Sequence, residues 1–198
     1  MRFQGPLLLF YILLSASHVS STVVVQNATY DDLTSTPILD TPVGTYKNLT
    51  YNAWVIAGPL TPGVTVGDVA SQSPPKAALT SVDAQLTNGT PTFTIAEPYK
   101  SFSLSDFYFG CQVRTDERTL GVATQCTITV AGFEANNDEE VALASFTFTP
   151  PLEPLTSVPM THAVLPATFL LPLSNVTIVQ SNEVADLKVD NLHYDVSN

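Results

Sequence analysis

Short runs of β-branched and aromatic residues recur along the 198 residues of this chain, and turn-forming residues separate them. A spacing of about ten residues between such runs is typical of all-β proteins built from antiparallel strands. The fifteen prolines argue against long helices, because proline lacks an amide proton and clashes with the preceding helical turn. We therefore expect strands at residues 22–25, 29–33, 49–56, 77–86, 92–95, 102–113, 123–133, 141–148, 160–165, 175–180 and 187–196.

Alternation of apolar and polar residues is clearest at residues 126–130, where Cys126, Ile128 and Val130 form one face and two threonines the other. The chain contains no internal repeat and no low-complexity segment long enough to be a linker. The sequence therefore predicts an all-β fold, an antiparallel two-sheet β-sandwich of the jelly-roll type, in which residues 22–198 form a single domain.

Residues 1–21 have the features of a secretory signal peptide. Arg2 is followed by an uninterrupted apolar stretch at residues 7–14 and then by small residues up to Ser21. The apolar stretch is too short and too close to the N-terminus for a membrane-spanning helix, and the polar residues 190–198 lack the apolar tail of a lipid-anchor signal. We expect a secreted, extracellular protein that does not insert into a membrane after the signal is removed.

Four Asn-x-Ser/Thr sequons are consistent with export, at Asn27, Asn48, Asn88 and Asn175. Such triplets also arise by chance in chains rich in Asn and Thr, and a site is glycosylated only where it is exposed. We expect these asparagines to be N-glycosylation sites, and each used site to mark the protein surface.

The only two cysteines, Cys111 and Cys126, flank a polar connection between two expected strands. An even pair in an oxidising compartment predicts a disulfide bond. Closing a loop of about 15 residues would stabilise the fold by about 3 kcal/mol on the chain-entropy model. The alternative is a nucleophilic or metal-binding thiol, but no second thiol cluster lies near either cysteine in the sequence.

Acidic residues outnumber basic ones, with eighteen Asp and Glu against seven Lys and Arg and a formal net charge of −11. Nucleic acids and anionic membranes both attract basic faces. This composition therefore argues against either as a partner.

Catalytic motifs are scarce. The chain has no Gly-x-Ser-x-Gly, His-Glu-x-x-His or glycine-rich phosphate loop, and only His162 and His193 lie outside the signal segment. A Ser-His-Asp hydrolase remains an alternative, because a triad can have any order along the chain. We expect His162 to be a surface residue, and His193 to face solvent or the opposite side of its sheet. The protein is therefore not expected to be an enzyme.

Asp190 stands out in the expected final strand. A strict period of two puts it on the same face as Leu192, Tyr194 and Val196, which is apolar. A buried carboxylate must be paired, hydrogen-bonded or bound to a cation. Either a hard cation such as calcium binds here, or Asp190 accepts backbone amides where two strands meet. We further expect the first and last segments of residues 22–198 to lie side by side.

The order of several short motifs resembles that of uncharacterised secreted fungal proteins with a jelly-roll, galactose-binding-like domain, similar to carbohydrate-binding modules. The matching segments are residues 30–33, 46–54, 102–104, 107–111, 126–132 and 190–192. In such modules an early acidic residue and an aspartate of the last strand often share a structural calcium. The resemblance implies that role for Asp31 or Asp32 together with Asp190.

Sugar-binding modules stack pyranose rings on exposed aromatic side chains. The resemblance therefore points to Trp54, the only tryptophan, and to Tyr51 as ligand-binding residues. The alternative for Trp54 is a core position, because Val55 and Ile56 follow it. The sequence favours a non-catalytic glycan-binding module of the cell surface or matrix. The alternatives are a structural protein that binds a cell-surface or secreted protein and no sugar, and then a hydrolase.

Overall fold

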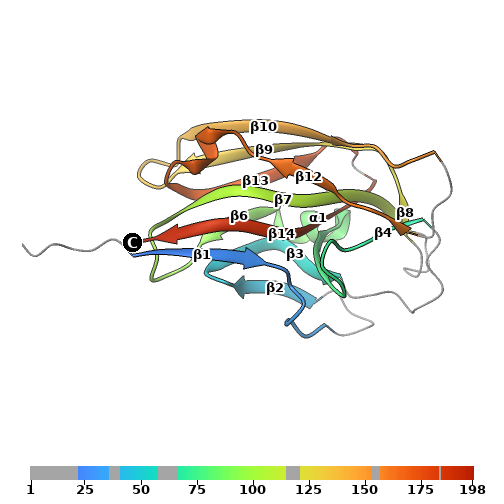
Figure 1. The fold of residues 1–198 in the computed structure, drawn as a ribbon, viewed down its shortest axis with the longest axis horizontal. Coiled ribbons are helices and arrows are strands. Elements are labelled where there is room, and N and C mark those ends of the chain that lie inside the picture. The colour runs from blue at the N-terminus through green and yellow to red at the C-terminus, as the bar shows by residue number, and fades with distance from the viewer. Residues whose placement is uncertain (1–21, 36–40, 58–66, 115–120, 153–156, 183) are drawn as a thin grey trace, which may run out of the picture.

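The computed structural model describes residues 22–35, 41–57, 67–114, 121–152, 157–182 and 184–198 (Figure 1). The predicted signal peptide, residues 1–21, lies outside the described residues. The elements are β1 (Val23–Ala28), β2 (Thr41–Tyr46), β3 (Leu49–Ala57), β4 (Asp68–Val69), β5 (Ala77–Thr80), α1 (Val82–Asn88), β6 (Thr92–Ile95), β7 (Ser101–Arg114), β8 (Gly121–Ala123), β9 (Cys126–Glu134), β10 (Glu140–Phe148), β11 (Ser157–Val158), β12 (Thr161–Val164), the 3-10 helix η1 (Ala167–Leu170), β13 (Leu173–Gln180) and β14 (Asp186–Ser197).

The main sheet closes on itself. Strands β13, β6, β3, β5, β14 and β7 pair in that order, and β7 returns to β13 through the pair Phe102 and Leu173. The prediction of a two-sheet jelly-roll sandwich is therefore wrong, although the all-β class is confirmed: six strands form a barrel, and further strands lie outside it. Alternation along a strand indicates which face is buried, but not which strand pairs with its edge.

Outside this ring, β9 and β10 extend the sheet beyond β13. Other strands outside the ring pair with β14 and β7: β1 pairs with β14, and β12 and β8 both pair with β7. Strand β2 pairs with β3, and β4 forms a separate parallel pair with β11. In Figure 1, β1, β14, β7 and β12 run side by side, and β9 and β10 lie above them.

The two ends of the described chain are neighbours. Strand β1 runs antiparallel to β14 from the pair Val23 and Ser197 to the pair Ala28 and Leu192. The expectation that the first and final segments lie side by side is confirmed. After β1, the expected strand at residues 29–33 is instead a turn, and Tyr30 has a φ of +62°.

The predicted disulfide is confirmed, and it joins Cys111 of β7 to Cys126 at the start of β9. Both cysteines are buried, as are Ile128 and Val130 on the predicted apolar face of β9. The bond therefore ties the barrel strand β7 to the strands that lie outside the ring.

The expected strand at residues 77–86 is only half correct. Strand β5 ends at Thr80, and α1 begins directly afterwards. The Ser81 hydroxyl caps the helix by accepting a hydrogen bond from the Ala84 amide (3.1 Å). Asp83 lies in the first turn, where its negative charge interacts favourably with the positive end of the helix dipole. In the described part of the chain, no helix has both the length and the apolar character to span a bilayer.

Candidate functional site

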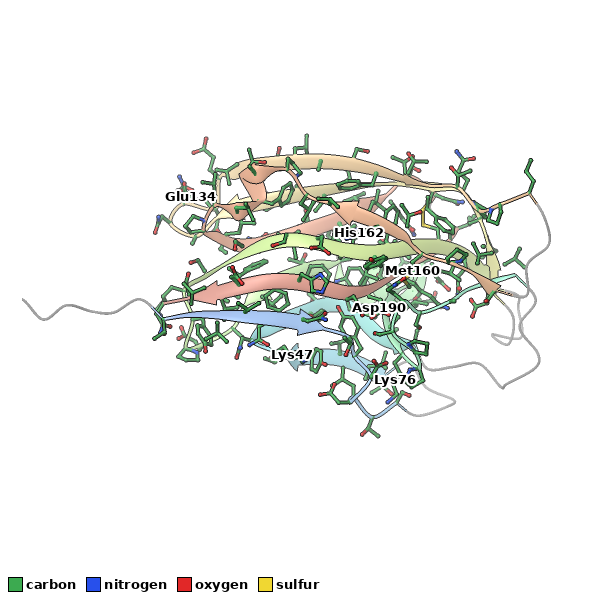
Figure 2. All side chains as sticks on the ribbon, viewed as in Figure 1. Lys47, Lys76, Glu134, Met160, His162 and Asp190 are labelled. Atoms are coloured by element: carbon green, nitrogen blue, oxygen red, sulfur yellow. A yellow bond between two sulfur atoms is a disulfide. The ribbon has the colours of Figure 1, made fainter. Side chains whose placement is uncertain are left out.

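Three adjacent strands, β14, β7 and β12, carry a group of polar side chains on one exposed face. The register places His193 of β14 opposite Asp106 of β7, and His162 of β12 opposite Tyr108 of β7. We call the outward side chains of Asp106, Tyr108, His162 and His193 the histidine face. Figure 2 labels His162, which lies on the strand β12 at the edge of this surface.

Asp106 binds both imidazoles through one oxygen. His162 Nε2 lies 2.9 Å from Asp106 Oδ1, and His193 Nδ1 lies 2.7 Å from the same atom. The Tyr108 ring stacks on His162, with ring centroids 4.4 Å apart and an interplanar angle of 10°. The side chains of His162 and His193 are 42% and 41% exposed, whereas that of Asp106 is 20% exposed. A partly buried carboxylate therefore holds two accessible rings.

The protonation of this group follows from its hydrogen bonds. Burial raises the pKa of Asp106, but the hydrogen bonds from the two histidines and their positive charge outweigh that effect and leave the pKa below its ordinary value. Because the ionised carboxylate only accepts, the histidine nitrogens that face it must carry protons. In the neutral rings, His162 Nδ1 and His193 Nε2 are then acceptors that point away from Asp106.

Two irregularities in the strands determine which side chains face outward. In β14 the register shifts between Asp190 and His193, and Asn191 between them has a φ of +49°. A second shift lies between the pairs His193–Asp106 and Tyr194–Leu104, where β7 contains one extra residue. Bulges of this kind redirect side chains from one face of a sheet to the other.

The prediction that Asp190 shares a face with Leu192, Tyr194 and Val196 is wrong because of the bulge at Asn191. Directly opposed residues share a face of a sheet, and Asp190 lies opposite Tyr108, whose ring stacks on the exposed His162. Asp190 is nevertheless fully buried. The segment that contains Ser73 covers it.

Asp190 is held by backbone amides. The Ser73 amide donates to Asp190 Oδ2 (2.8 Å), and the Asn191 amide donates to Asp190 Oδ1 (2.8 Å). This arrangement matches the alternative in which Asp190 accepts amides where chain segments meet. Burial nevertheless raises the pKa of Asp190 to about 6, because it outweighs the effect of these hydrogen bonds.

The raised pKa makes stability depend on pH. The folded state holds the Asp190 proton more tightly than the unfolded chain does, so this contribution is fully present below about pH 4 and is lost as the pH rises through about 6. A shift of about two pKa units corresponds to about 3 kcal/mol. We expect Asp190→Asn to flatten the pH dependence of the unfolding free energy between about pH 4 and pH 7, measured by urea denaturation.

The Asp190→Asn variant also loses one hydrogen-bond acceptor, which changes its stability at every pH. The readout is therefore the slope of the unfolding free energy against pH, not its value at a single pH. Asp195→Asn, five residues further along β14, is the matched control and should leave the slope of the wild type unchanged. An unaltered slope in the Asp190 variant would contradict the raised pKa.

The three carboxylates predicted to share calcium each have a separate donor. The Lys76 amide donates to Asp31 Oδ1 (3.1 Å), and the Tyr46 hydroxyl donates to Asp32 Oδ1 (2.6 Å). Within the described ranges, no group of three or more His, Cys, Asp or Glu side chains is placed to hold a metal ion. Asp31 is nevertheless close enough to Asp190 to raise its pKa, and calcium binding by these carboxylates stays a prediction.

The aromatic residues predicted to bind a ligand lie in the core. Trp54 is 1% exposed and stacks on Phe93, with ring centroids 5.0 Å apart. Tyr51 is also buried, and its ring meets the Phe93 ring in a T-shaped arrangement. Neither ring presents a face to a sugar. The alternative of a core position for Trp54 matches the structure, because its side chain is buried against Phe93.

The predicted glycosylation sites all lie on described surface or turns. Asn27 and Asn88 are exposed, and Asn27 lies opposite His193 on the edge strand β1. Asn48 lies in the two-residue turn between β2 and β3, and Asn175 lies on β13; both are half-buried.

Sequence reasoning assigned no role to Asp106 and treated each histidine separately. The three residues lie on three different strands, so no spacing along the chain links them. The one signal was Asn191, because asparagine is enriched among residues with a positive φ.

No protein-family model matches this chain, and no curated protein matches it. Its fold is similar to that of a DUF4465 family protein from Bacteroides caccae ATCC 43185, with 9% sequence identity, a TM-score of 0.52, and coverage of 86% of this chain and 98% of that one. The K1 cleaved adhesin domain of Lys-gingipain from Porphyromonas gingivalis W83 has 10% identity, a TM-score of 0.42, and coverage of 87% and 97%. Neither is described as fungal or galactose-binding-like. At 9% identity, the likeness to the DUF4465 protein concerns the fold alone.

Proposed function

We propose that this chain is a secreted, non-catalytic binding protein whose histidine face contacts a neutral glycan of the cell surface or matrix. The observation that carries this proposal is the shared carboxylate, which orients two exposed imidazoles at once. Each ring in its neutral form then has one acceptor nitrogen on the side away from Asp106, and both side chains are partly exposed. Neighbouring hydroxyl groups on a sugar are donors that suit such a pair of acceptors.

Binding is favoured over covalent catalysis by what surrounds the rings. Among the described residues, no serine, threonine or cysteine side chain is hydrogen-bonded to His162 or His193, as an activated nucleophile would be. Both cysteines are in the disulfide. The disulfide and the signal-like segment at residues 1–21 support export.

The test is glycan-array binding of the purified protein, followed by titration with the best ligand. We expect His162→Ala combined with His193→Ala to weaken binding at least about tenfold, since two hydrogen bonds of about 1 kcal/mol each are lost.

Asp195→Asn, on the same strand as His193, is the control and should bind like the wild type. A calcium chelator in a parallel array tests the cation predicted from the resemblance. Glycan binding that survives the double histidine variant would place the ligand elsewhere. No glycan binding, with recovery of a bound secreted or surface protein, would favour the structural alternative. Turnover of glycosides or esters would contradict the non-catalytic assignment.

A further inference from the structure

Asn175, one of the four sequon asparagines, has an aromatic neighbour on the adjacent strand. The register places Asn175 of β13 directly opposite Phe133 of β9, the residue before Glu134, which Figure 2 labels. Directly opposed residues share a sheet face, with Cβ atoms about 4.5–5.5 Å apart. The alternate residues of β13, Val176 and Ile178, are buried, so Asn175 is on the outer face of the sheet.

Phe133 is on the same outer face and takes no part in the core. Gly132, which precedes it on β9, is buried between the side chains of Ala142 and Leu173. Phe133 itself is half-buried, and it belongs neither to the described hydrophobic core nor to the partly buried residues packed against that core. An aromatic ring is therefore left on the surface beside a sequon asparagine.

The side chain of Asn175 is held on the side of β13 that faces β9. Asn175 Nδ2 donates to Ser174 Oγ (3.1 Å), and Ser174 Oγ lies 3.3 Å from the carbonyl oxygens of both Phe133 and Glu134. Nδ2 is the atom to which an N-linked glycan is attached. Its position directs the first sugar towards Phe133, and not towards Thr94, which lies opposite Asn175 on β6.

We propose that Asn175 carries an N-linked glycan and that the apolar face of its first N-acetylglucosamine packs on the Phe133 ring. The inference rests on the export included in the proposed function. The sugar donor is an oligosaccharide linked to a lipid through a diphosphate. Asn175 Nδ2 forms a bond to C1 of the sugar, the bond from C1 to the diphosphate oxygen breaks, and Nδ2 loses one of its two protons. The other proton remains for the hydrogen bond to Ser174 Oγ.

The contact needs little intrinsic affinity. The C–H groups on one face of a pyranose ring pack on an aromatic ring, whose face is apolar and carries partial negative charge. The covalent link gives the sugar a high effective concentration beside Phe133. The other sequons lack such a neighbour: Asn27 lies opposite His193, Asn48 lies in a turn, and Asn88 ends α1.

The experiment expresses the full chain through a eukaryotic secretory pathway and maps glycopeptides of the product by mass spectrometry. We expect Asn175 to be occupied. The second measurement is a double-mutant cycle on the melting temperature, with Phe133→Ala made in the wild type and in Asn175→Gln. We expect Phe133→Ala to lower Tm by about 2–4 °C more in the glycosylated protein than in Asn175→Gln.

Two controls make the coupling specific. Asn88→Gln removes a different sequon, so Phe133→Ala should lower Tm there as much as in the wild type. Phe133→Tyr keeps the aromatic face and should preserve the stabilisation by the Asn175 glycan. If Phe133→Ala is not exported, Phe133→Leu takes its place with the same expected direction, because leucine is apolar but has no flat ring.

The outcomes separate this inference from the proposed function. Failure of export overturns both. An exported protein with an unmodified Asn175 overturns the inference alone, and so does an occupied Asn175 whose effect on Tm is independent of Phe133. Loss of glycan-array binding by the histidine face, with the coupling between Asn175 and Phe133 intact, overturns the proposed function alone.

Discussion

Replacing Trp54 with alanine is expected to lower the free energy of unfolding by about 3–5 kcal/mol. The indole is almost fully buried and stacks on Phe93, which in turn contacts Tyr51 edge-on. Truncation removes apolar contacts with these rings and leaves a cavity that the closed barrel cannot collapse to fill. Urea denaturation followed by far-UV circular dichroism measures the loss.

Trp54→Phe provides the control for volume and chemistry. The indole Nε1 is buried and has no hydrogen-bond partner among the described residues, so phenylalanine removes an unsatisfied donor along with part of the ring. We expect this variant to lose clearly less stability than Trp54→Ala. A Trp54→Ala protein that kept wild-type stability but lost glycan binding would restore the ligand-binding role predicted from the sequence.

Replacing Lys188 with methionine is expected to cost about 3–5 kcal/mol of unfolding free energy. Lys188 Nζ donates to Asp68 Oδ1 (3.0 Å) and to the Val69 carbonyl (2.8 Å), and both charged residues are buried. Methionine keeps most of the side-chain volume but leaves the Asp68 carboxylate buried without this cation. An uncompensated buried charge is more costly than the ion pair is stabilising.

The partner substitution distinguishes the lost charge from lost packing. Adding Asp68→Leu to Lys188→Met removes the uncompensated carboxylate and should recover a large part of the stability. Lys100→Met is the surface control: its ion pair with Glu97 spans 3.4 Å, but the side chains are 68% and 83% exposed. It should change stability by less than about 1 kcal/mol. Equal losses in Lys188→Met and the double variant would show that packing, not charge, holds β14 to β4.

The candidate site was only partly accessible to sequence reasoning. The predicted burial of Asp190 is confirmed, and its two backbone-amide donors match one of the two alternatives that the sequence leaves open. Its face was predicted wrongly, because a period of two cannot anticipate the extra residue at Asn191. Without that bulge Asp190 and His193 would lie on opposite faces, since they are three residues apart.

Trp54 and Tyr51 show a related difficulty. An aromatic residue in an alternating strand can either pack in the core or bind a ligand at the surface. Which of the two it does depends on the residues of other strands that lie against it. Here Phe93, on the adjacent strand β6, occupies the position against which both rings pack.

The sequence by itself determined the properties that depend on near neighbours: an all-β chain, alternating strands such as β9, and the pairing of the only two cysteines. The tertiary structure decided the closure of the barrel, the outward position of Asp190 and the meeting of Asp106 with two histidines. Local alternation reflects the burial of one strand face. Strand order and a one-residue bulge depend instead on how strands far apart in the sequence pack together, and that information is spread over the whole sheet.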